Sequence, residues 1–459
     1  MTVETPVRPA YRWIGQKVLR LEDRRLLHGK GRFLEDLEPV PRAWHAAIVR
    51  SPHAHARIRS IDVTRAAGMP GVLGVLTGED VARMADPFPL TVKIPIRYYP
   101  LAVDRVRFVG EAVAVVVAEN RYVAEDAAHA VSVEYEPLTP VVDIEAAMAA
   151  DAPLLHGELG SNIANSRRFD YGDYDAARRR AHRVVRGRFR FPKVSSTPIE
   201  TYQVLAAYDS QQDEYTVWSN FHGPFTLHPV MAKALRVPLN RLRLLTPPDI
   251  GGSYGIKAGV YTYIVLMALA ARKFGVPVRW SEDRLEHLMA SSSGTDSLIE
   301  AEAAVDADGR ILGLYLRRMD NVGAYLRPPE PACLFRTHGN TTGPYDIANL
   351  RLETVAVMTN KAPTGLNRGY GGPQLYFALE RLVDRVAREL GLDPADVRRR
   401  NLIQPHEMPY RTVSGGLYDS GDYPAALERT LELVGYEQWR WRQRDLRDRG
   451  KYVGIGLGL

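Results

Sequence analysis

The chain has 459 residues, of which 45% are hydrophobic and 25% charged, and its formal net charge is +6. This length exceeds what one hydrophobic core supports and predicts about two to four domains. No stretch approaches the roughly 18 uninterrupted apolar residues of a membrane span, and no basic segment followed by an apolar one opens the chain, so we expect a cytoplasmic protein without membrane contact.

The excess of basic residues does not indicate a nucleic-acid-binding protein. The arginines are scattered and are countered by 54 acidic residues; the densest basic run, WRWRQRDLRDRGK from Trp439, interleaves acids as a solvated helix face does. A single cysteine, Cys333, excludes an internal disulfide and a four-cysteine iron–sulfur or zinc site, and we expect it to be a small buried side chain. Any redox chemistry therefore needs electron carriers on other chains.

Residues 1–27 read as an irregular N-terminal arm of mixed charge. From Trp44 to Val141, β-rich runs such as GVLGVLTG and EAVAVVVAE alternate with helical pieces such as NRYVAEDAAHA, which predicts an α/β unit. The segments EPLTPVVD and IEAAMAADAP predict a boundary near residue 150. We therefore expect a mixed α/β domain over residues 28–148.

Beyond this boundary the pattern becomes that of an α+β domain. Strands are expected in RRAHRVVRGRFRF, in both halves of YQVLAAYDSQQDEYTVWSN and in RLRLLTPPD, with a short helix in LHPVMAKALRVP. Asp308-Gly309 predicts the turn of a long hairpin. Apolar residues then recur at helical spacing from Leu375 to Leu390, Gly391 ends that helix, Asp393 and Pro394 open the next, and a third begins near Pro424.

The segment DIGGSYGIKAG, from Asp249, carries a glycine-rich loop between an expected strand and an expected helix. Such a loop lets backbone N–H groups approach an anion, to which a helix N-terminus adds partial positive charge. Ala258 follows Lys257 where a phosphate loop has Ser or Thr, and the spacing is not that of a dinucleotide fold, although a nucleotide-binding protein stays a remote alternative. On its glycines alone, the loop is equally well explained as a tight turn without a ligand.

A second glycine-rich turn, APTGLNRGYGGPQ from Ala362, holds an arginine and an aromatic ring and again opens a long helix. Arginine offers fixed donors to oxo groups or a carboxylate. Two such turns in one chain predict an elongated anionic ligand that is bound by one turn on each side.

With these motifs the sequence resembles the molybdopterin-binding large subunits of the xanthine dehydrogenase, aldehyde oxidase and carbon-monoxide-dehydrogenase group. Seven segments carry the resemblance in the same order along nearly the whole chain: RLEDRRLLHGKGRFLEDL, SPHAHARI, STPIETYQVLAAYD, GGSYGIK, GVPVRWSEDRLEHL, the block from RGYGGPQ to RRRNLI, and PYRTVSGGLYDSGDY. The resemblance implies an α/β hammerhead domain at 28–148, the first half of a molybdopterin-binding region at 149–425, and at 426–459 the start of a second cofactor-binding half.

The resemblance also implies roles for individual residues. The loop against the pterin and the molybdenum ligands corresponds to Gly251, Gly252, Ser253, Tyr254 and Gly255, with tyrosine in place of the usual phenylalanine. In the second turn, Arg368 and Gly369 correspond to cofactor-binding positions, with Arg368 beside the metal. Tyr370 matches the aromatic residue that walls in the substrate.

Three departures from the family pattern limit the function. His222 stands where a glutamine usually bonds a molybdenum oxo ligand, unless the alignment in that loop is shifted by one; an imidazole changes charge near neutral pH, so activity would acquire a pH dependence. Ala258 replaces the acidic residue of purine-oxidising members, and the GYGGPQ turn lacks the copper-carrying cysteine loop. Neither xanthine nor carbon monoxide is therefore expected as substrate.

The third departure is the absence of the G-x-G-E motif, whose glutamate is the catalytic base of the family. By the resemblance, the sequence RGKYVGIGLGL corresponds to a strand at the entrance of the second half. The glutamate base belongs to that second half, so we expect no catalytic residue in this chain. The resemblance implies a molybdopterin cofactor, most commonly the cytosine dinucleotide form, and partners that carry a [2Fe–2S] cluster, FAD and the second half. The implied reaction is oxidation of an aldehyde or an N-heteroaromatic or other aromatic compound, with water as oxygen source. The alternative is a truncated fragment or assembly piece without activity.

Overall fold

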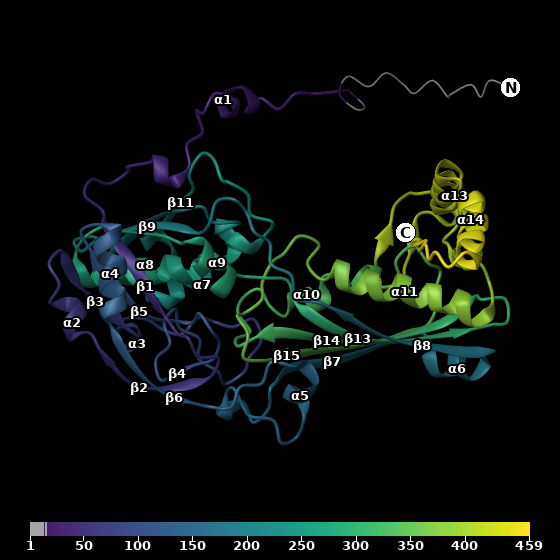
Figure 1. The fold of residues 1–459 in the computed structure, drawn as a ribbon, viewed down its shortest axis with the longest axis horizontal. Helices are drawn as coiled ribbons and strands as arrows, with labels where there is room; N and C mark the ends of the chain where they lie inside the picture. Colours follow the sequence, from purple (N-terminus) through teal and green to yellow (C-terminus); the bar gives the residue numbers. More distant parts are fainter. Residues whose placement is uncertain (1–12, 14–15) are drawn as a thin grey trace.

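The computed structural model describes residue 13 and residues 16–459. The molecule is elongated, with two lobes that are each built on a β-sheet (Figure 1). Most of the expected N-terminal arm, residues 1–12 and 14–15, lies outside the described residues. The remainder of the arm is not wholly irregular, because it contains the short helix α1 (Asp23–Leu27) and is followed by the 3-10 helix η1 (Leu34–Asp36).

The first lobe contains a seven-stranded sheet in the order β11-β10-β9-β12-β1-β5-β3. Its strands are β1 (Trp44–Arg50), β3 (Val72–Thr77), β5 (Ala112–Ala118), β9 (Gln203–Asp209), β10 (Glu214–Ser219), β11 (Leu242–Leu245) and β12 (Val278–Ser281). β1 pairs in parallel with β12, so one sheet joins strands from both sides of the boundary expected near residue 150. The two sequence segments therefore share one sheet and one hydrophobic core.

Helices cover both faces of this sheet. On one face of the sheet, α4 (Arg121–Ala130) packs against Ala114 and Val116 of β5. On the other face, α8 (Tyr261–Phe274) shares a hydrophobic core with Val115 and Val117 of the same strand. Because both faces are covered, β5 consists only of buried alanine and valine. A three-stranded sheet of β2 (Ala56–Asp62), β4 (Arg105–Val106) and β6 (Ser132–Pro137) completes the lobe.

The second lobe is a five-stranded sheet in the order β7-β15-β14-β13-β8. Its strands are β7 (Ile163–Tyr171), β8 (Arg183–Phe191), β13 (Asp296–Val305), β14 (Ile311–Gly323) and β15 (Leu350–Met358). The expected hairpin is confirmed: β13 and β14 are antiparallel, and Gly309 in the turn has a φ of +87°. The long helix α11 (Gly372–Leu390) buries its apolar side on this sheet and ends at Gly391, which is left-handed as predicted.

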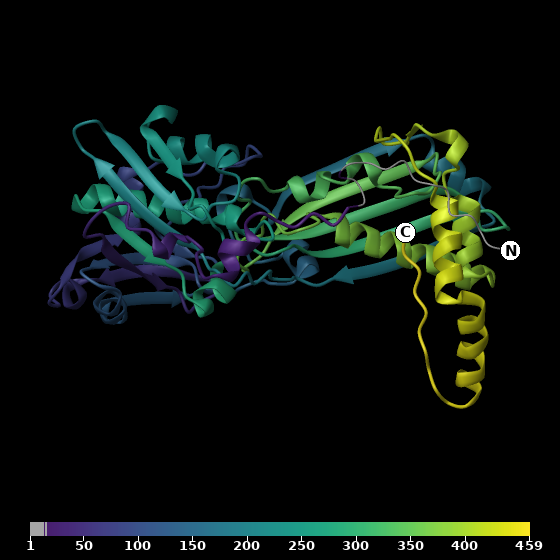
Figure 2. The same cartoon turned by 90° about the horizontal axis from the view of Figure 1, so that it is seen from above.

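The helices that follow α11 lie at the far end of the second lobe (Figure 2). They are α12 (Pro394–Asn401), α13 (Tyr423–Val434) and α14 (Tyr436–Asp448), with the small ladder β16 (Tyr410–Arg411) and β17 (Leu417–Tyr418) between the first two. The predicted cap of α12 is confirmed, because the Asp393 carboxylate accepts from the N–H of Ala395. The basic run on α14 is largely exposed, as expected.

The short helices complete the chain. They are α2 (Thr64–Ala67), α3 (Gly78–Met84), α5 (Ile144–Met148), η2 (Gly157–Leu159), α6 (Tyr174–Arg180), α7 (Pro224–Ala234), η3 (Leu239–Arg241), η4 (Ile256–Val260), α9 (Arg284–Ala290), α10 (Ala332–Phe335), η5 (His338–Asn340) and η6 (Pro405–Glu407). No helix of the described residues is both long and apolar enough to cross a bilayer.

The strand expected in RGKYVGIGLGL is wrong, because residues 449–459 form no regular element. Instead, Ile455 and Leu457 pack against the core of the second lobe, and the Leu457 carbonyl oxygen accepts from Nη2 of Arg398 at 2.8 Å. Glycine at positions 454, 456 and 458 weakens strand formation. The Arg398 guanidinium thus donates the hydrogen bond that the Leu457 carbonyl would otherwise accept from a neighbouring strand.

Candidate cofactor-binding site

The first glycine loop, which follows β11, has a backbone that only small residues permit at several positions. Gly252 and Gly255 have φ values of +89° and +98°, and Tyr254 adopts +54° although it has a side chain. A Cβ atom on Gly251 would lie 2.4 Å from the Cβ of Glu200. These glycines are therefore required by the path of the loop and by its contact with the segment before β9.

Glu200 anchors this loop, a role that the sequence analysis did not assign. Its Oε2 accepts from the N–H of Gly251 at 2.7 Å and from Nζ of Lys257 at 2.5 Å. The Lys257 side chain is fully buried and that of Glu200 is 9% exposed. Burial lowers the pKa of Lys257, against the opposing effect of Glu200. A lysine held in this way cannot reach a bound phosphate, which argues against the nucleotide-binding alternative.

The helix expected directly after the loop begins later than predicted. The 3-10 helix η4 intervenes, and α8 starts at Tyr261, which is fully buried. The loop therefore leads first into η4, whose first residue Ile256 follows Gly255, and the expected contribution of a helix end to anion binding stays a prediction. Backbone N–H groups of the loop remain available: that of Gly252 has no acceptor within the described residues.

The second glycine-rich turn opens its helix as predicted. Gly369, Tyr370 and Gly371 all have positive φ, and α11 begins at the next residue. A Cβ on Gly371 would lie 2.1 Å from the carbonyl oxygen of Cys333. The buried guanidinium of Arg318 donates from Nη1 to the Gly371 carbonyl at 3.0 Å. Contacts with Cys333 and Arg318 of the second lobe therefore fix the position of this turn.

The two turns meet. The N–H of Arg368 donates to the carbonyl oxygen of Tyr254 at 2.8 Å, and the guanidinium carbon lies 5.1 Å from the centroid of the Tyr254 ring. Both side chains are exposed, and Arg368 forms no ion pair with a described residue. The structure therefore brings Arg368 and the first loop into one exposed surface, as the resemblance implied.

His222 lies at the same surface, just before α7. Its Nδ1 is 3.1 Å from the hydroxyl oxygen of Ser253, which also accepts from the N–H of Gly255. The imidazole is exposed. The structure therefore places His222, Ser253 and Arg368 around the first loop.

Tyr370 lies in the second turn and is less exposed than Arg368. It is half-buried, its hydroxyl is enclosed without a hydrogen-bond partner, and burial followed by the nearby Glu330 raises its pKa well above the usual range. A cavity of about 70 Å³ is lined by Tyr370, Arg368 and Gln374 among others. Cys333 also lines it; it is 2% exposed, and burial raises the pKa of its thiol, which confirms the expected buried side chain.

These features fit a ligand that carries hydrogen-bond acceptors and negative charge. The loop has an unused N–H at Gly252, a glycine at 251 with no room for a side chain, and an exposed arginine without a carboxylate partner. Within the described chain, no cluster of three or more His, Cys, Asp or Glu residues is placed to hold a metal. The side chains at these loops are donors and rings that would surround a cofactor.

Comparison with protein families agrees with this geometry. Residues 155–402 match the model described as "Molybdopterin cofactor-binding domain", and residues 28–139 match "Aldehyde oxidase and xanthine dehydrogenase, a/b hammerhead domain". The first match contains both glycine-rich turns. The expected fold, a hammerhead domain followed by a molybdopterin-binding domain, is confirmed.

Individual proteins are similar over nearly the whole chain. The 6-hydroxypseudooxynicotine dehydrogenase complex subunit gamma of Paenarthrobacter nicotinovorans is 38% identical over 97% of this chain and 57% of its own length. The crystal structure of quinoline 2-oxidoreductase from Pseudomonas putida 86 superposes with a TM-score of 0.87 at 36% identity, covering 95% of this chain and 56% of that one. The chain thus spans somewhat more than half the length of these relatives.

One relative of different length is matched almost completely. The nicotinate dehydrogenase large molybdopterin subunit of Eubacterium barkeri is 27% identical over 94% of this chain and 99% of its own length. The same region of the fold thus corresponds to a whole subunit in one protein and to part of a longer chain in others.

Proposed function

Because this chain belongs to the xanthine dehydrogenase and aldehyde oxidase family of molybdopterin-binding proteins, we propose that it is the first half of the large subunit of a molybdenum hydroxylase. The reaction would be oxidation of a small organic molecule with water as oxygen source. The single observation that carries this proposal is the contact between the two glycine-rich turns, which joins Arg368 to Tyr254 in one exposed surface.

The residues of this surface would bind and orient the cofactor. The cofactor, when bound, supplies the redox chemistry and the activation of water. The N–H of Gly252 and the Ser253 hydroxyl would donate to it, on a loop whose path Gly251 and Gly255 permit by packing against Glu200 and Leu366. Arg368 would donate charge-assisted hydrogen bonds, each contributing about 1.5 to 3 kcal/mol. His222 would donate a hydrogen bond to the cofactor, in place of the glutamine that the family resemblance implies at this position.

The substrate would lie next to the second turn. Tyr370 and Arg368 line the same small cavity, so an aromatic ring and a donor flank the approach to the cofactor. We propose an N-heteroaromatic compound, with an aldehyde as the second candidate. Similarity to quinoline 2-oxidoreductase and to the 6-hydroxypseudooxynicotine dehydrogenase subunit supports the heteroaromatic ring. Ala258 and the missing cysteine loop argue against xanthine and carbon monoxide.

Catalysis would require chemistry that these 459 residues do not hold. We propose that the other half of the cofactor-binding region supplies the glutamate base, and that further subunits carry a [2Fe–2S] cluster and FAD in a cytoplasmic complex. Two observations support this: a relative named as one subunit of a dehydrogenase complex, and a relative matched over 99% of its own length. We propose the cytosine dinucleotide form of molybdopterin.

The test is purification of the complex from native cells through an affinity tag on this chain. Mass spectrometry should identify co-purifying flavin, iron–sulfur and G-x-G-E-containing chains, and the complex should contain near-stoichiometric molybdenum and oxidise quinoline or nicotinate with a dye as electron acceptor. Nucleotide released by acid hydrolysis should be CMP. A chain that purifies alone with trace molybdenum would support the inactive fragment instead.

A further inference from the structure

The first lobe contains a second cavity, away from the glycine-rich turns, that carries three arginines. Its volume is about 560 Å³, and it lies where the loop before β5 meets the segment around η2 and Tyr325. The three arginines are Arg97, Arg105 and Arg107. None of the residues assigned to the cofactor lines this cavity.

These arginines have no carboxylate partner among the described residues. None of the three lies within ion-pair distance of a carboxylate in the described part of the chain. Arg107 is 9% exposed and is held by the Leu155 carbonyl at 3.0 Å and the Tyr325 hydroxyl at 3.1 Å, while no described acceptor contacts its Nη2. Nε of Arg105 is buried without a partner. Arg107 is thus buried without a carboxylate, and Arg105 keeps one buried donor unpaired, so an incoming anion would supply the missing acceptors.

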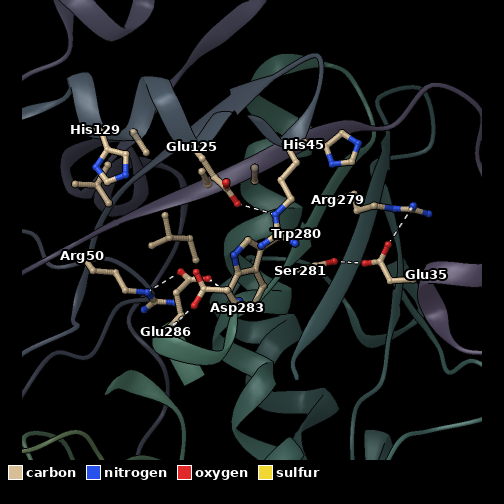
Figure 3. A pocket seen from close by; sticks show the side chains of 16 residues that line it. Glu35, His45, Arg50, Glu125, His129, Arg279, Trp280, Ser281, Asp283 and Glu286 are labelled. Atoms are coloured by element: carbon tan, nitrogen blue, oxygen red, sulfur yellow. Dashed lines mark hydrogen bonds and ion pairs between the residues drawn. The ribbon is translucent and has the colours of Figure 1, made fainter. Parts of the chain in front are cut away.

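Another cavity of the first lobe provides a contrast. It has a volume of about 440 Å³ and lies between β1, α4 and α9 (Figure 3). Each of its arginines faces an acid: Arg50 with Glu286 at 2.8 Å, Arg121 with Glu125 at 2.6 Å, and Arg279 with Glu35 at 3.6 Å. Its charges neutralise one another, and an anion would gain little by entering it.

Three carboxylates lie near these arginines, but none forms an ion pair with them in the described part of the chain. Asp104 is exposed, and the half-exposed Glu158 lies 3.8 Å from Nδ1 of the buried His156. The buried Glu111 accepts instead from the Tyr325 hydroxyl at 2.7 Å and from the backbone N–H of Arg107. Burial is the main cause that lowers the pKa of His156 to about 3, and the charge of Arg107 lowers it further.

The apolar part of the lining restricts the shape of a ligand. Two tyrosines, Tyr99 and Tyr325, line the cavity with Leu101, Val103 and Leu154. Aromatic and aliphatic walls favour a flat organic body over a bare inorganic ion, and a guanidinium fork matches a carboxylate or a phosphate.

We propose that this cavity is a binding site for a small organic anion, a carboxylate or phosphate on a planar apolar body, held by Arg97, Arg105 and Arg107. The site is separate from the cofactor surface, so its occupancy does not depend on the proposed reaction. The two anion chemistries share the same recognition by guanidinium groups.

Isothermal titration of the purified full chain tests the proposal with four probes: inorganic phosphate, phenyl phosphate, benzoate and the neutral benzamide. Saturable binding of phenyl phosphate or benzoate, tighter than that of inorganic phosphate and absent for benzamide, is expected. Whichever organic anion binds, phenyl phosphate or benzoate, identifies the anionic group that the cavity recognises. Binding of benzamide as tight as that of benzoate, or no saturable binding of either organic anion, would overturn the proposal.

Variants locate the binding. Arg97→Ala removes an exposed side chain and should weaken binding several-fold without changing the melting temperature. Arg97→Ala/Arg105→Ala should weaken it about tenfold or more, as expected for the loss of charge-assisted hydrogen bonds. The matched control is Arg243→Ala, an exposed arginine on β11 without an ion pair, which should bind like the wild type. Equal binding by Arg97→Ala and Arg243→Ala would place the anion elsewhere and contradict the assignment, even if the double variant fails to fold.

Discussion

The N–H of Arg368 donates to the carbonyl oxygen of Tyr254 at 2.8 Å, and its guanidinium lies over the ring of the same tyrosine. A single residue pair therefore couples two turns that are far apart in the sequence. Because the backbone contact does not involve the side chain of Arg368, that side chain can be removed without separating the turns. This makes it the best position at which to test cofactor binding independently of folding.

Arg368→Ala should lower kcat/KM of the complex by about 10- to 100-fold, since it removes one charge-assisted hydrogen bond to the cofactor or substrate. The melting temperature should stay within experimental error of the wild type, because the side chain is exposed. Steady-state kinetics and molybdenum content check both statements. Arg243→Ala is the control for loss of one surface charge, and equal kinetics of the two variants would refute the role of Arg368.

Glu200→Gln and Lys257→Met should each destabilise the protein by about 3 to 5 kcal/mol, because each leaves the other member of a buried ion pair without its partner. The double variant should lose less than the sum of the two, since neither charge then remains. Urea unfolding of all three variants measures this coupling. Additive losses would show that the pair does not act as a unit in anchoring the first loop.

Glu330 should make the stability depend on pH. It is fully buried, and burial raises its pKa to about 7 from the ordinary 4.5. The folded state therefore holds this proton more tightly than the unfolded state, so the free energy of unfolding should fall as the pH rises from about 4.5 to about 7 and then level off. The contribution is at most about 3 kcal/mol.

Glu330→Gln should flatten this part of the profile, and Glu111→Gln should do the same, because burial raises the pKa of Glu111 to about 7 as well. Chemical denaturation across that pH range is the measurement. Glu79→Gln, which changes an exposed acid, is the control and should leave the slope unchanged. A Glu330→Gln profile parallel to that of Glu79→Gln would contradict the prediction.

His222→Gln should keep most of the activity, because an amide can donate a hydrogen bond to the same cofactor group. His222→Ala removes the donor and should lower kcat/KM by about tenfold or more. Steady-state kinetics of both variants decide this, and wild-type kinetics for His222→Ala would place His222 outside the cofactor's reach.

Much of the fold was predictable because its local signals were strong. The helical period from Leu375 to Leu390, its stop at Gly391 and the Asp308-Gly309 hairpin are properties of short segments, and the structure confirms them. The parallel pairing of β1 with β12 was not predictable, because it joins distant segments and leaves no local pattern. The strand β2 was also missed, since charged residues interrupt its alternation.

The candidate site likewise combines features that the sequence predicts with features that only the folded chain shows. Glycines that permit positive φ mark both turns in the sequence, and the contact between them follows from the fold. Glu200 gave no local signal, because its role depends on Lys257 lying opposite it in space. The α-helix expected directly after the first loop starts later, at Tyr261, because the 3-10 helix η4 intervenes, and propensity alone does not specify such a shift.

The position of the molybdenum atom tests the central claim most directly. Anomalous diffraction at the molybdenum edge, from crystals of the complex purified with its cofactor, locates the metal without assumptions about the ligand. The peak should lie at the surface formed by Ser253, His222 and Arg368. A peak distant from both glycine-rich turns would contradict the assignment of this surface as the cofactor site.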